Sequence, residues 1–230
     1  MLIELSHVIS EKNTIVPPNH PQAQLIPRTE IKKGDLSNTA VIKMSTHSGT
    51  HIDAPFHFNP QGLSIDMIDL SSFIFVKPVV ISCPKKERES ISLKDLSHYS
   101  SKIKDCDLLM IYTGFEKYRQ TNPYKYVHEA PTLSLEGAEY LIKNFTLKGI
   151  AIDLIGIENI DEGRKKGFPV HKVFFKHPSS PREFIIIEDV NLSKVVNRKI
   201  KKVYAIPLRI KGADGSPATV FAEVETLNQK

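Results

Sequence analysis

Six short apolar runs, separated by polar segments, constrain the fold of this 230-residue chain more than any other feature of its sequence. They cover residues 73–82, 108–113, 149–155, 184–187, 203–210 and 219–224. Short runs that are apolar throughout are typical of buried β-strands. Pro207 lies inside one of them and predicts a strand edge or a bulge, because proline has no backbone N–H to donate.

Helical periodicity occurs between the second and third of these runs. Residues 134–144 predict a helix with Ser134 as its N-cap, and a shorter helix is expected to start at Ser92 with Asp95 as a capping partner. The apolar face of the longer helix comprises Leu135, Ala138, Leu141 and Ile142. Strands in both halves with a helix between them predict an α/β fold. Since the chain has no repeat, low-complexity block or long linker, we expect residues 1–230 to form a single domain.

Composition narrows the class of protein further. The net charge is +5, but the lysines and arginines form short scattered patches without interleaved aromatic residues, which favours a solvated surface over a nucleic-acid interface. The two cysteines, Cys83 and Cys106, form no CxxC pair, which favours a reducing cytoplasm. The N-terminus lacks the apolar core of a signal peptide, and no run approaches the roughly 20 apolar residues of a membrane span.

The segment THSGTHIDAPFH, residues 46–57, holds three of the nine histidines of the chain. Ser, Gly and Thr are poor helix formers, and Pro55 disfavours helix just before it, so an extended or looped backbone is expected. In an extended backbone His51 and Asp53 point the same way, while Ile52 points into the core.

Imidazole nitrogens beside a carboxylate are typical ligands of Zn, Mn or Fe. The alternative is that His47, His51, Asp53 and His57 each satisfy a separate hydrogen bond in the core, which requires several buried polar groups to find partners independently. We therefore interpret the segment as part of a metal site.

Two residues outside the segment are candidates to complete that site. Glu188 ends the apolar run 184–187, where a carboxylate is costly unless it is paired or metal-bound. A salt bridge to a lysine would explain it equally well. His171 follows Phe168-Pro169-Val170, and a surface histidine after a loop is the alternative interpretation there.

The sequence HSGTHIDAPFH resembles the H-x-G-T-H-x-D-x-P-x-H signature of the cyclase-like metal hydrolases, which include bacterial kynurenine formamidase and isatin hydrolase. Further segments similar to this family occur in order along nearly the whole chain. They are residues 5–7, 112–114, 151–153, 168–171, 187–192, 207–208 and 212–217. The resemblance implies a mixed β-sheet or barrel-like core with flanking helices, of the swivelling β/α type.

The resemblance also implies a ligand set. His47, His51 and Asp53 would bind one divalent metal, and Asp53 and Glu188 would bridge to a second metal that His171 also holds. The ions expected are Zn or Mn. The same resemblance suggests a homo-oligomer, a dimer or a tetramer.

The implied activity is metal-dependent hydrolysis of an amide-type C–N bond, in a formamide or a cyclic amide of a small molecule. Metal-activated hydroxide would attack the carbonyl, and His57 would act as acid/base. Val16, in the stretch Ile15-Val16-Pro17-Pro18, would contact the substrate at a position where kynurenine formamidases have a tryptophan; this chain has none. Residues 172–187 look longer than usual for the family, with an inserted loop at 178–181.

Two other functions deserve comparison with this one. A serine hydrolase needs a G-x-S-x-G nucleophile elbow, which the chain lacks. A metal-binding protein of the same fold without hydrolase turnover remains the alternative, and metal content measured beside hydrolysis would separate the two.

Overall fold

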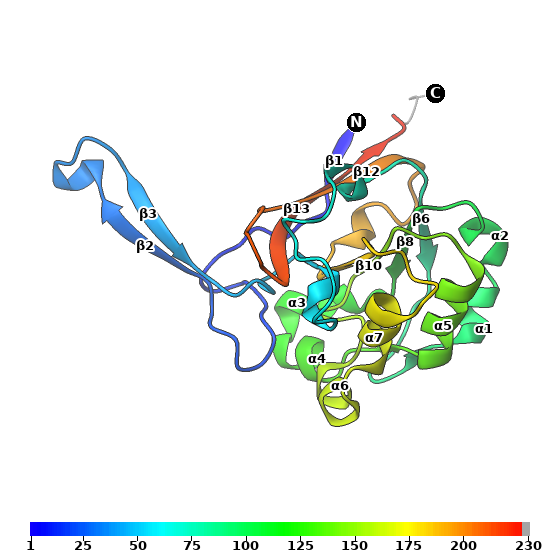
Figure 1. The fold of residues 1–230 in the computed structure, drawn as a ribbon. Coiled ribbons are helices and arrows are strands. Elements are labelled where there is room, and N and C mark those ends of the chain that lie inside the picture. The colour runs from blue at the N-terminus through cyan, green and yellow to red at the C-terminus, as the bar shows by residue number, and fades with distance from the viewer. Residues whose placement is uncertain (227–230) are drawn as a thin grey trace.

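A nine-stranded sheet forms the centre of the computed structural model, which describes residues 1–226 (Figure 1). In spatial order its strands are β5 (Ile74–Phe75), β12 (Ile200–Pro207), β13 (Gly215–Val224), β4 (His51–Asp53), β11 (Ile185–Glu188), β10 (Gly149–Ile152), β8 (Leu108–Tyr112) and β6 (Pro78–Ser82), with β1 (Leu2–Glu4) paired to β13. Strand β6, at the far end of this order, contacts β12. The sheet therefore curls into a nearly closed, barrel-like form, as predicted.

The strands differ in direction and in burial across the sheet. β6, β8, β10 and β11 are parallel to one another, whereas β4, β13, β12 and β5 pair antiparallel. Along β11, Ile186 packs in one apolar core with the helices, while Ile185 and Ile187 pack in a second core inside the curl of the sheet. Because both faces are buried, these strands are apolar at nearly every position, which is why the sequence predicts them well.

The helices cover the outer face of the parallel strands (Figure 1). The α-helices are α1 (Leu93–Ser97), α2 (Ser100–Ile103), α3 (Tyr118–Thr121), α4 (Pro123–His128), α5 (Leu135–Asn144), α6 (Ile160–Lys166) and α7 (Pro169–Lys176). The 3₁₀ turns are η1 (Ile31–Lys33), η2 (Pro55–His57), η3 (Leu70–Phe73), η4 (Phe115–Lys117) and η5 (Leu192–Lys194). Ser134 caps α5, and Ser92 forms a capping box with Asp95 at α1, so both predicted helices are confirmed.

The sequence predicts one strand over residues 73–82, but the structure has two, β5 and β6. β5 pairs with β12 and β6 pairs with β8, so the chain leaves one part of the sheet and enters another between them. The backbone N–H groups of Val76 and Lys77 donate to the Asp107 carboxylate, at 2.8 and 3.0 Å. The Asp107 carboxylate thus accepts the hydrogen bonds that a neighbouring strand would accept if the strand were continuous. Because Asp107 lies some 30 residues further along the chain, no local sequence pattern reveals the break.

Two features at the edges of the fold complete the comparison with the sequence. Pro207 ends β12 and pairs only with Ala218 of β13, beyond the last residue of β5, which confirms a strand edge. The hairpin of β2 (Gln24–Thr29) and β3 (Thr39–Lys43) is not predicted, and it projects from the body as an arm (Figure 1). A small parallel pair, β7 (Ser90–Ile91) and β9 (Thr132–Leu133), lies apart from the main sheet.

The α/β prediction is confirmed by this architecture. Within residues 1–226, none of the helices is long and apolar enough to cross a membrane. Cys83 and Cys106 are both buried and free.

Candidate metal centre

The histidine-rich segment folds as a turn, a short strand and a 3₁₀ turn, as its composition predicts. Gly49 takes a left-handed conformation, with φ of +62°, before the chain enters β4. β4 lies between β11 and β13 and carries His51 and Asp53, while η2 carries His57. Ile52 between the two ligand candidates is fully buried in the core.

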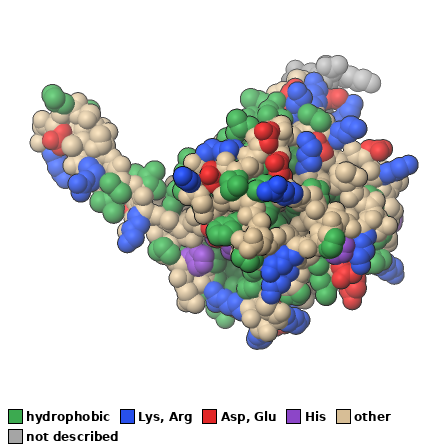
Figure 2. Space-filling view, viewed as in Figure 1, with side chains coloured by type: hydrophobic (Ala, Val, Ile, Leu, Met, Phe, Trp, Pro, Cys, Tyr) green, Lys and Arg blue, Asp and Glu red, His purple; other side chains and the backbone are tan. Residues whose placement is uncertain are grey.

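The structure brings all six predicted metal and acid/base residues to one cavity of about 200 Å³. They are His47, His51, Asp53, His57, His171 and Glu188. Histidine side chains reach the molecular surface beside the base of the β2–β3 arm (Figure 2). The sequence therefore identifies side chains that converge in space, although they come from a turn and four separate elements, β4, η2, α7 and β11.

The two distant candidates are buried at this cavity, so the structure contradicts the alternatives of a surface histidine and of a salt bridge to a lysine. His171 lies on α7, not on the surface, and is 4% exposed. Glu188 ends β11 directly opposite His51 on β4, and its salt-bridge contacts are to histidines and not to a lysine.

The two carboxylates each face imidazoles on both sides of the cavity. Asp53 Oδ1 lies 2.8 Å from His47 Nδ1 and 3.3 Å from His51 Nε2, and its Oδ2 lies 3.8 Å from His171 Nε2. Glu188 Oε2 lies 3.4 Å from His51 Nε2, and its Oε1 lies 3.4 Å from His171 Nε2. Carboxylates that face two sets of nitrogen donors in this way are suited to bridging.

His47, His51 and His171 each face the Asp53 and Glu188 carboxylates with one ring nitrogen. The second ring nitrogen of each faces an oxygen that can only accept a hydrogen bond. His51 Nδ1 donates to the carbonyl oxygen of Gly49 at 2.8 Å, and His171 Nδ1 donates to Glu158 at 2.6 Å. His47 Nε2 donates to Asp214 at 2.9 Å. A neutral imidazole carries one N–H, so the nitrogen that faces the carboxylates keeps a lone pair for a cation.

Two atoms at the centre of the cluster fit a metal. His51 Nε2 and Asp53 Oδ1 are buried, and despite their close contacts they make no hydrogen bond of normal geometry among the described residues. Buried polar atoms are normally paired, and nitrogen and carboxylate donors are the set that Zn and Mn prefer. The residues present therefore fit a divalent cation.

The electrostatics of the cluster agree with that fit. Burial would lower the pKa of His47 and His171, but the surrounding carboxylates outweigh it. Asp53 and Asp214 raise the pKa of His47 to about 9, and Glu158 and Glu188 raise the pKa of His171 to about 10. Protons on the imidazoles thus balance the buried carboxylates, and a divalent cation can replace those protons.

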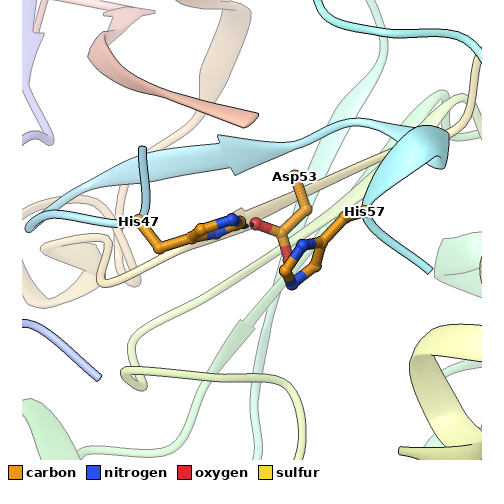
Figure 3. Close-up of side chains that lie close together, drawn as sticks. All are labelled: His47, Asp53 and His57. Atoms are coloured by element: carbon orange, nitrogen blue, oxygen red, sulfur yellow. Dashed lines mark ion pairs between the residues drawn. The ribbon is translucent and has the colours of Figure 1, made fainter. Parts of the chain in front are cut away.

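His57 lies at the more open side of the cluster. Figure 3 shows the rings of His47 and His57 directed at Asp53 from two sides. The His57 side chain is 25% exposed, and its Nδ1 lies 2.8 Å from Asp214 Oδ2. Within residues 1–226, two groups have donor atoms close enough to share an ion: His47, Asp53 and His57, and His51, Asp53 and Glu188. Geometry alone therefore permits His57 either to bind a cation or to act on a substrate.

The rest of the cavity wall is largely apolar. Phe58, Ile155, Ile160 and Phe168 line it, with Arg164 among the polar lining residues. The predicted substrate contact, Val16, does not line this cavity.

Val16 lines an adjoining surface recess instead. That recess is formed with Tyr124 and Val127, and it shares Pro17 and His20 with the central cavity.

Glu158 and Asp214 are site residues that the sequence analysis does not single out. Glu158 is 4% exposed and lies within the apolar stretch IGIENI, residues 155–160, so a carboxylate in an apolar context was a usable signal. Asp214 lies in the segment 212–217 that resembles the closing loop of the family, but nothing in its neighbours indicates that it meets two histidines.

A second buried charge cluster adjoins the first. Asp189, the residue after Glu188, accepts hydrogen bonds from Arg119 Nε and Nη2 at 2.7 and 2.6 Å. The hydroxyl of Tyr126 donates to the same carboxylate at 2.8 Å. Arg119 and Asp189 are 3% and 1% exposed. Arg119 thereby ties α3, and Tyr126 ties α4, to the end of β11.

Together, the curled sheet and the buried cluster of imidazoles and carboxylates define a metal-dependent hydrolase type of site. Residues 3–159 match the model of the cyclase family, so the chain belongs to that family. A kynurenine formamidase from Geobacillus thermodenitrificans is 30% identical over 220 residues, which cover 94% of this chain and 93% of the relative. The predicted family is confirmed.

Solved structures share the fold. Isatin hydrolase A from Labrenzia aggregata matches with a TM-score of 0.80 and 20% identity, over 96% of this chain and 93% of its own. A structure described as a potential metal-dependent hydrolase with cyclase activity matches with a TM-score of 0.73 and 25% identity, over 96% of both chains. The prediction that this chain is a hydrolytic enzyme is confirmed by these relatives.

Proposed function

We propose that this protein is a metal-dependent amidohydrolase that cleaves an amide-type C–N bond, in a formamide or a cyclic amide, of a small molecule. The observation that carries the proposal is the orientation of three imidazoles. His47, His51 and His171 each have one nitrogen held by an outer oxygen and the other directed at Asp53 or Glu188. The names of the relatives, kynurenine formamidase and isatin hydrolase, support the amide-type bond.

The ligand assignment that we propose follows the contacts. His47 and His51 would hold one ion with Asp53, and His171 would hold a second with the bridging carboxylates Asp53 and Glu188. The ions would be Zn or Mn. When bound, divalent cations polarise a carbonyl oxygen and lower the pKa of water toward neutrality.

The remaining steps belong to residues of the chain. His57, with Nδ1 held by Asp214, has Nε2 free to move a proton to the departing nitrogen. Phe58 and Phe168 provide an apolar wall for a flat substrate, and the cavity volume limits its size. Arg164 offers a positive charge for a substrate carboxylate. Val16 would contact any part of the substrate that extends into the adjoining recess.

The test combines metal analysis with kinetics. We expect the purified protein to hold divalent metal and to hydrolyse members of a panel of formamides and cyclic amides. His57→Ala should keep the wild-type metal content and lose about 10²- to 10⁴-fold in kcat. Bound metal without turnover on the whole panel would favour the alternative, a metal-binding protein without hydrolase activity. A loss of metal in His57→Ala would make His57 a ligand.

The proposal also covers the assembly and the location of the protein. We propose that residues 1–230 act as one domain in a cytoplasmic homo-oligomer, a dimer or a tetramer. Free buried cysteines suit a reducing compartment. An isolated two-stranded hairpin is marginally stable, and the arm exposes Leu25 and its cross-strand partner Ile42 by 58% and 62%. A second subunit would cover them.

Light scattering coupled to size-exclusion chromatography tests the assembly. The double variant Leu25→Ser/Ile42→Ser should shift the protein toward a smaller species and leave the monomeric body folded. A monomeric wild-type protein would contradict the proposed oligomer.

A further inference from the structure

One carboxylate oxygen meets two histidines with different proposed roles. Asp214 Oδ2 lies 2.9 Å from His47 Nε2 and 2.8 Å from His57 Nδ1, and the rings of the two histidines are 4.1 Å apart between centroids. The other oxygen, Oδ1, accepts a hydrogen bond from the hydroxyl of Thr46 at 3.0 Å. The Asp214 side chain is 34% exposed, so the carboxylate lies at the border of the buried cluster.

The backbone around Asp214 is fixed by the strand that carries the ligands. The carbonyl oxygen of Asp214 accepts from the N–H of Ala54 at 2.9 Å, and Gly215 pairs with Asp53 across β13 and β4. A Cβ at Gly215 would lie 2.6 Å from the carbonyl oxygen of Ile52, so only glycine allows this approach. Asp214 therefore keeps a fixed place relative to both histidines.

The hydrogen-bonding chemistry of a carboxylate then determines which nitrogens carry protons. An ionised carboxylate only accepts, so Nε2 of His47 and Nδ1 of His57 must both be N–H groups. In neutral imidazoles this leaves lone pairs on Nδ1 of His47, which faces Asp53, and on Nε2 of His57. Fixing a tautomer through an outer carboxylate is a common way to orient a metal-binding histidine.

We propose that Asp214 is a positioning residue that sets the tautomers of two imidazoles at once: a metal ligand, His47, and the acid/base, His57. The roles of those histidines rest on the proposed function, whereas the shared hydrogen bonds do not. Metal binding and proton transfer are thereby coupled through one side chain. Loss of Asp214 should weaken both, although Asp214 belongs to neither candidate ligand group and does not line the cavity.

The first test measures metal affinity. Asp214→Ala, stripped of metal and titrated with Zn²⁺ against a chromophoric chelator, should show a Kd about 10- to 100-fold above wild type. Asp66→Ala is the matched control. Asp66 accepts from the N–H of Gly212 in the same loop and does not contact the histidines, so its Kd should stay within about threefold of wild type. An unchanged Kd in Asp214→Ala, or an equal loss in Asp66→Ala, would overturn the proposal.

The second test observes the tautomers directly. In ¹⁵N-histidine spectra of the zinc-loaded wild-type protein, His57 should be protonated at Nδ1. Asp214→Asn should retain that form, because its amide oxygen can still accept while its NH₂ group donates to Thr46. Protonation of His57 at Nε2 in the wild type would contradict the inference.

Kinetics provide the third test and separate the two proposals. At saturating metal, Asp214→Ala should lose about 10²-fold in kcat with KM changed only a few-fold. A wild-type kcat in this variant would show that Asp214 does not position His57, and would contradict the proposal. If the wild type hydrolyses nothing on the panel, the proposed function fails, yet the zinc titration and the spectra still decide the role of Asp214. If Asp214→Ala does not fold, Asp214→Asn with its intermediate expected Kd takes its place.

Discussion

Glu188 and Asp189 are adjacent in the chain, and both carboxylates are buried, but their surroundings differ in one decisive respect. Asp189 meets a guanidinium in a two-pronged geometry and a tyrosine hydroxyl, so its charge is balanced by the fold itself. Glu188 meets two imidazoles at 3.4 Å and one backbone N–H, that of Ile157, at 2.7 Å. The first cluster is complete without a ligand, and the second is not.

The difference teaches how a buried charge can be assigned to structure or to function. Arginine remains protonated at every ordinary pH, so the Arg119–Asp189 pair offers nothing to an added cation. The imidazoles of the other cluster can give up protons to a divalent cation, and two buried atoms without a hydrogen bond among the described residues, His51 Nε2 and Asp53 Oδ1, fit such an ion. Burial alone would not distinguish the two clusters. What distinguishes them is whether each buried polar atom has a hydrogen-bond partner.

The largest effect is expected from Asp53→Asn. The change removes the charge of the carboxylate that faces His47, His51 and His171. Metal affinity should fall by more than the roughly 100-fold that loss of an outer partner can cost, and hydrolysis should fall to background. Metal analysis after dialysis checks this expectation. Wild-type metal content in the variant would show that Asp53 is not a ligand.

Arg119→Met should act on stability instead. It leaves the Asp189 carboxylate buried without its partner, which costs about 3–5 kcal/mol in the free energy of unfolding. Denaturant titration measures the loss, and the folded fraction should keep its metal content. If this variant loses metal as Asp53→Asn does, the two clusters are not separable and the comparison fails.

A smaller effect should follow from metal addition. A metal that binds only the folded protein, at a free concentration 100 times the Kd, raises the free energy of unfolding by about 2.7 kcal/mol. Wild type and Arg119→Met should both gain this increment in thermal unfolding, and Asp53→Asn should not. Equal gains in all three proteins would point to metal binding elsewhere.

The smallest expected effect is that of Tyr126→Phe. It deletes one hydrogen bond to Asp189 while the two from Arg119 remain, so the loss should be about 1–2 kcal/mol. Unfolding curves of the variant beside Arg119→Met would show whether the charged pair carries most of the energy. A loss as large as that of Arg119→Met would assign equal weight to the hydroxyl.

Sequence patterns predict those parts of the fold whose burial is periodic along the chain. Helix α5 is an example because it buries one face at helical spacing, and strands β8, β10 and β11 are examples because they are buried at nearly every position. The strands β2 and β3 are exposed along almost their whole length, so no burial pattern marks them. Their pairing follows from contacts within the arm alone.

The same reasoning explains which residues of the candidate site could be predicted from the sequence. Four of its side chains lie within residues 47–57, close enough for spacing to indicate a metal. The residues alone made His171 and Glu188 candidates with equally good alternatives, and only the resemblance to a family implied ligand roles for them. Asp214 is 157 residues from His57, and the two side chains meet only because β13 returns to β4. No local pattern encodes a contact of that kind.

The pairing of β4 with β11 places Glu188 opposite His51 and Ile186 opposite Asp53. Deleting or inserting a single residue in either strand would reverse which side chains face the cavity. Insertions and deletions are therefore not tolerated in these two strands. At the tip of the β2–β3 arm, added residues would alter what the protein contacts without altering the catalytic site.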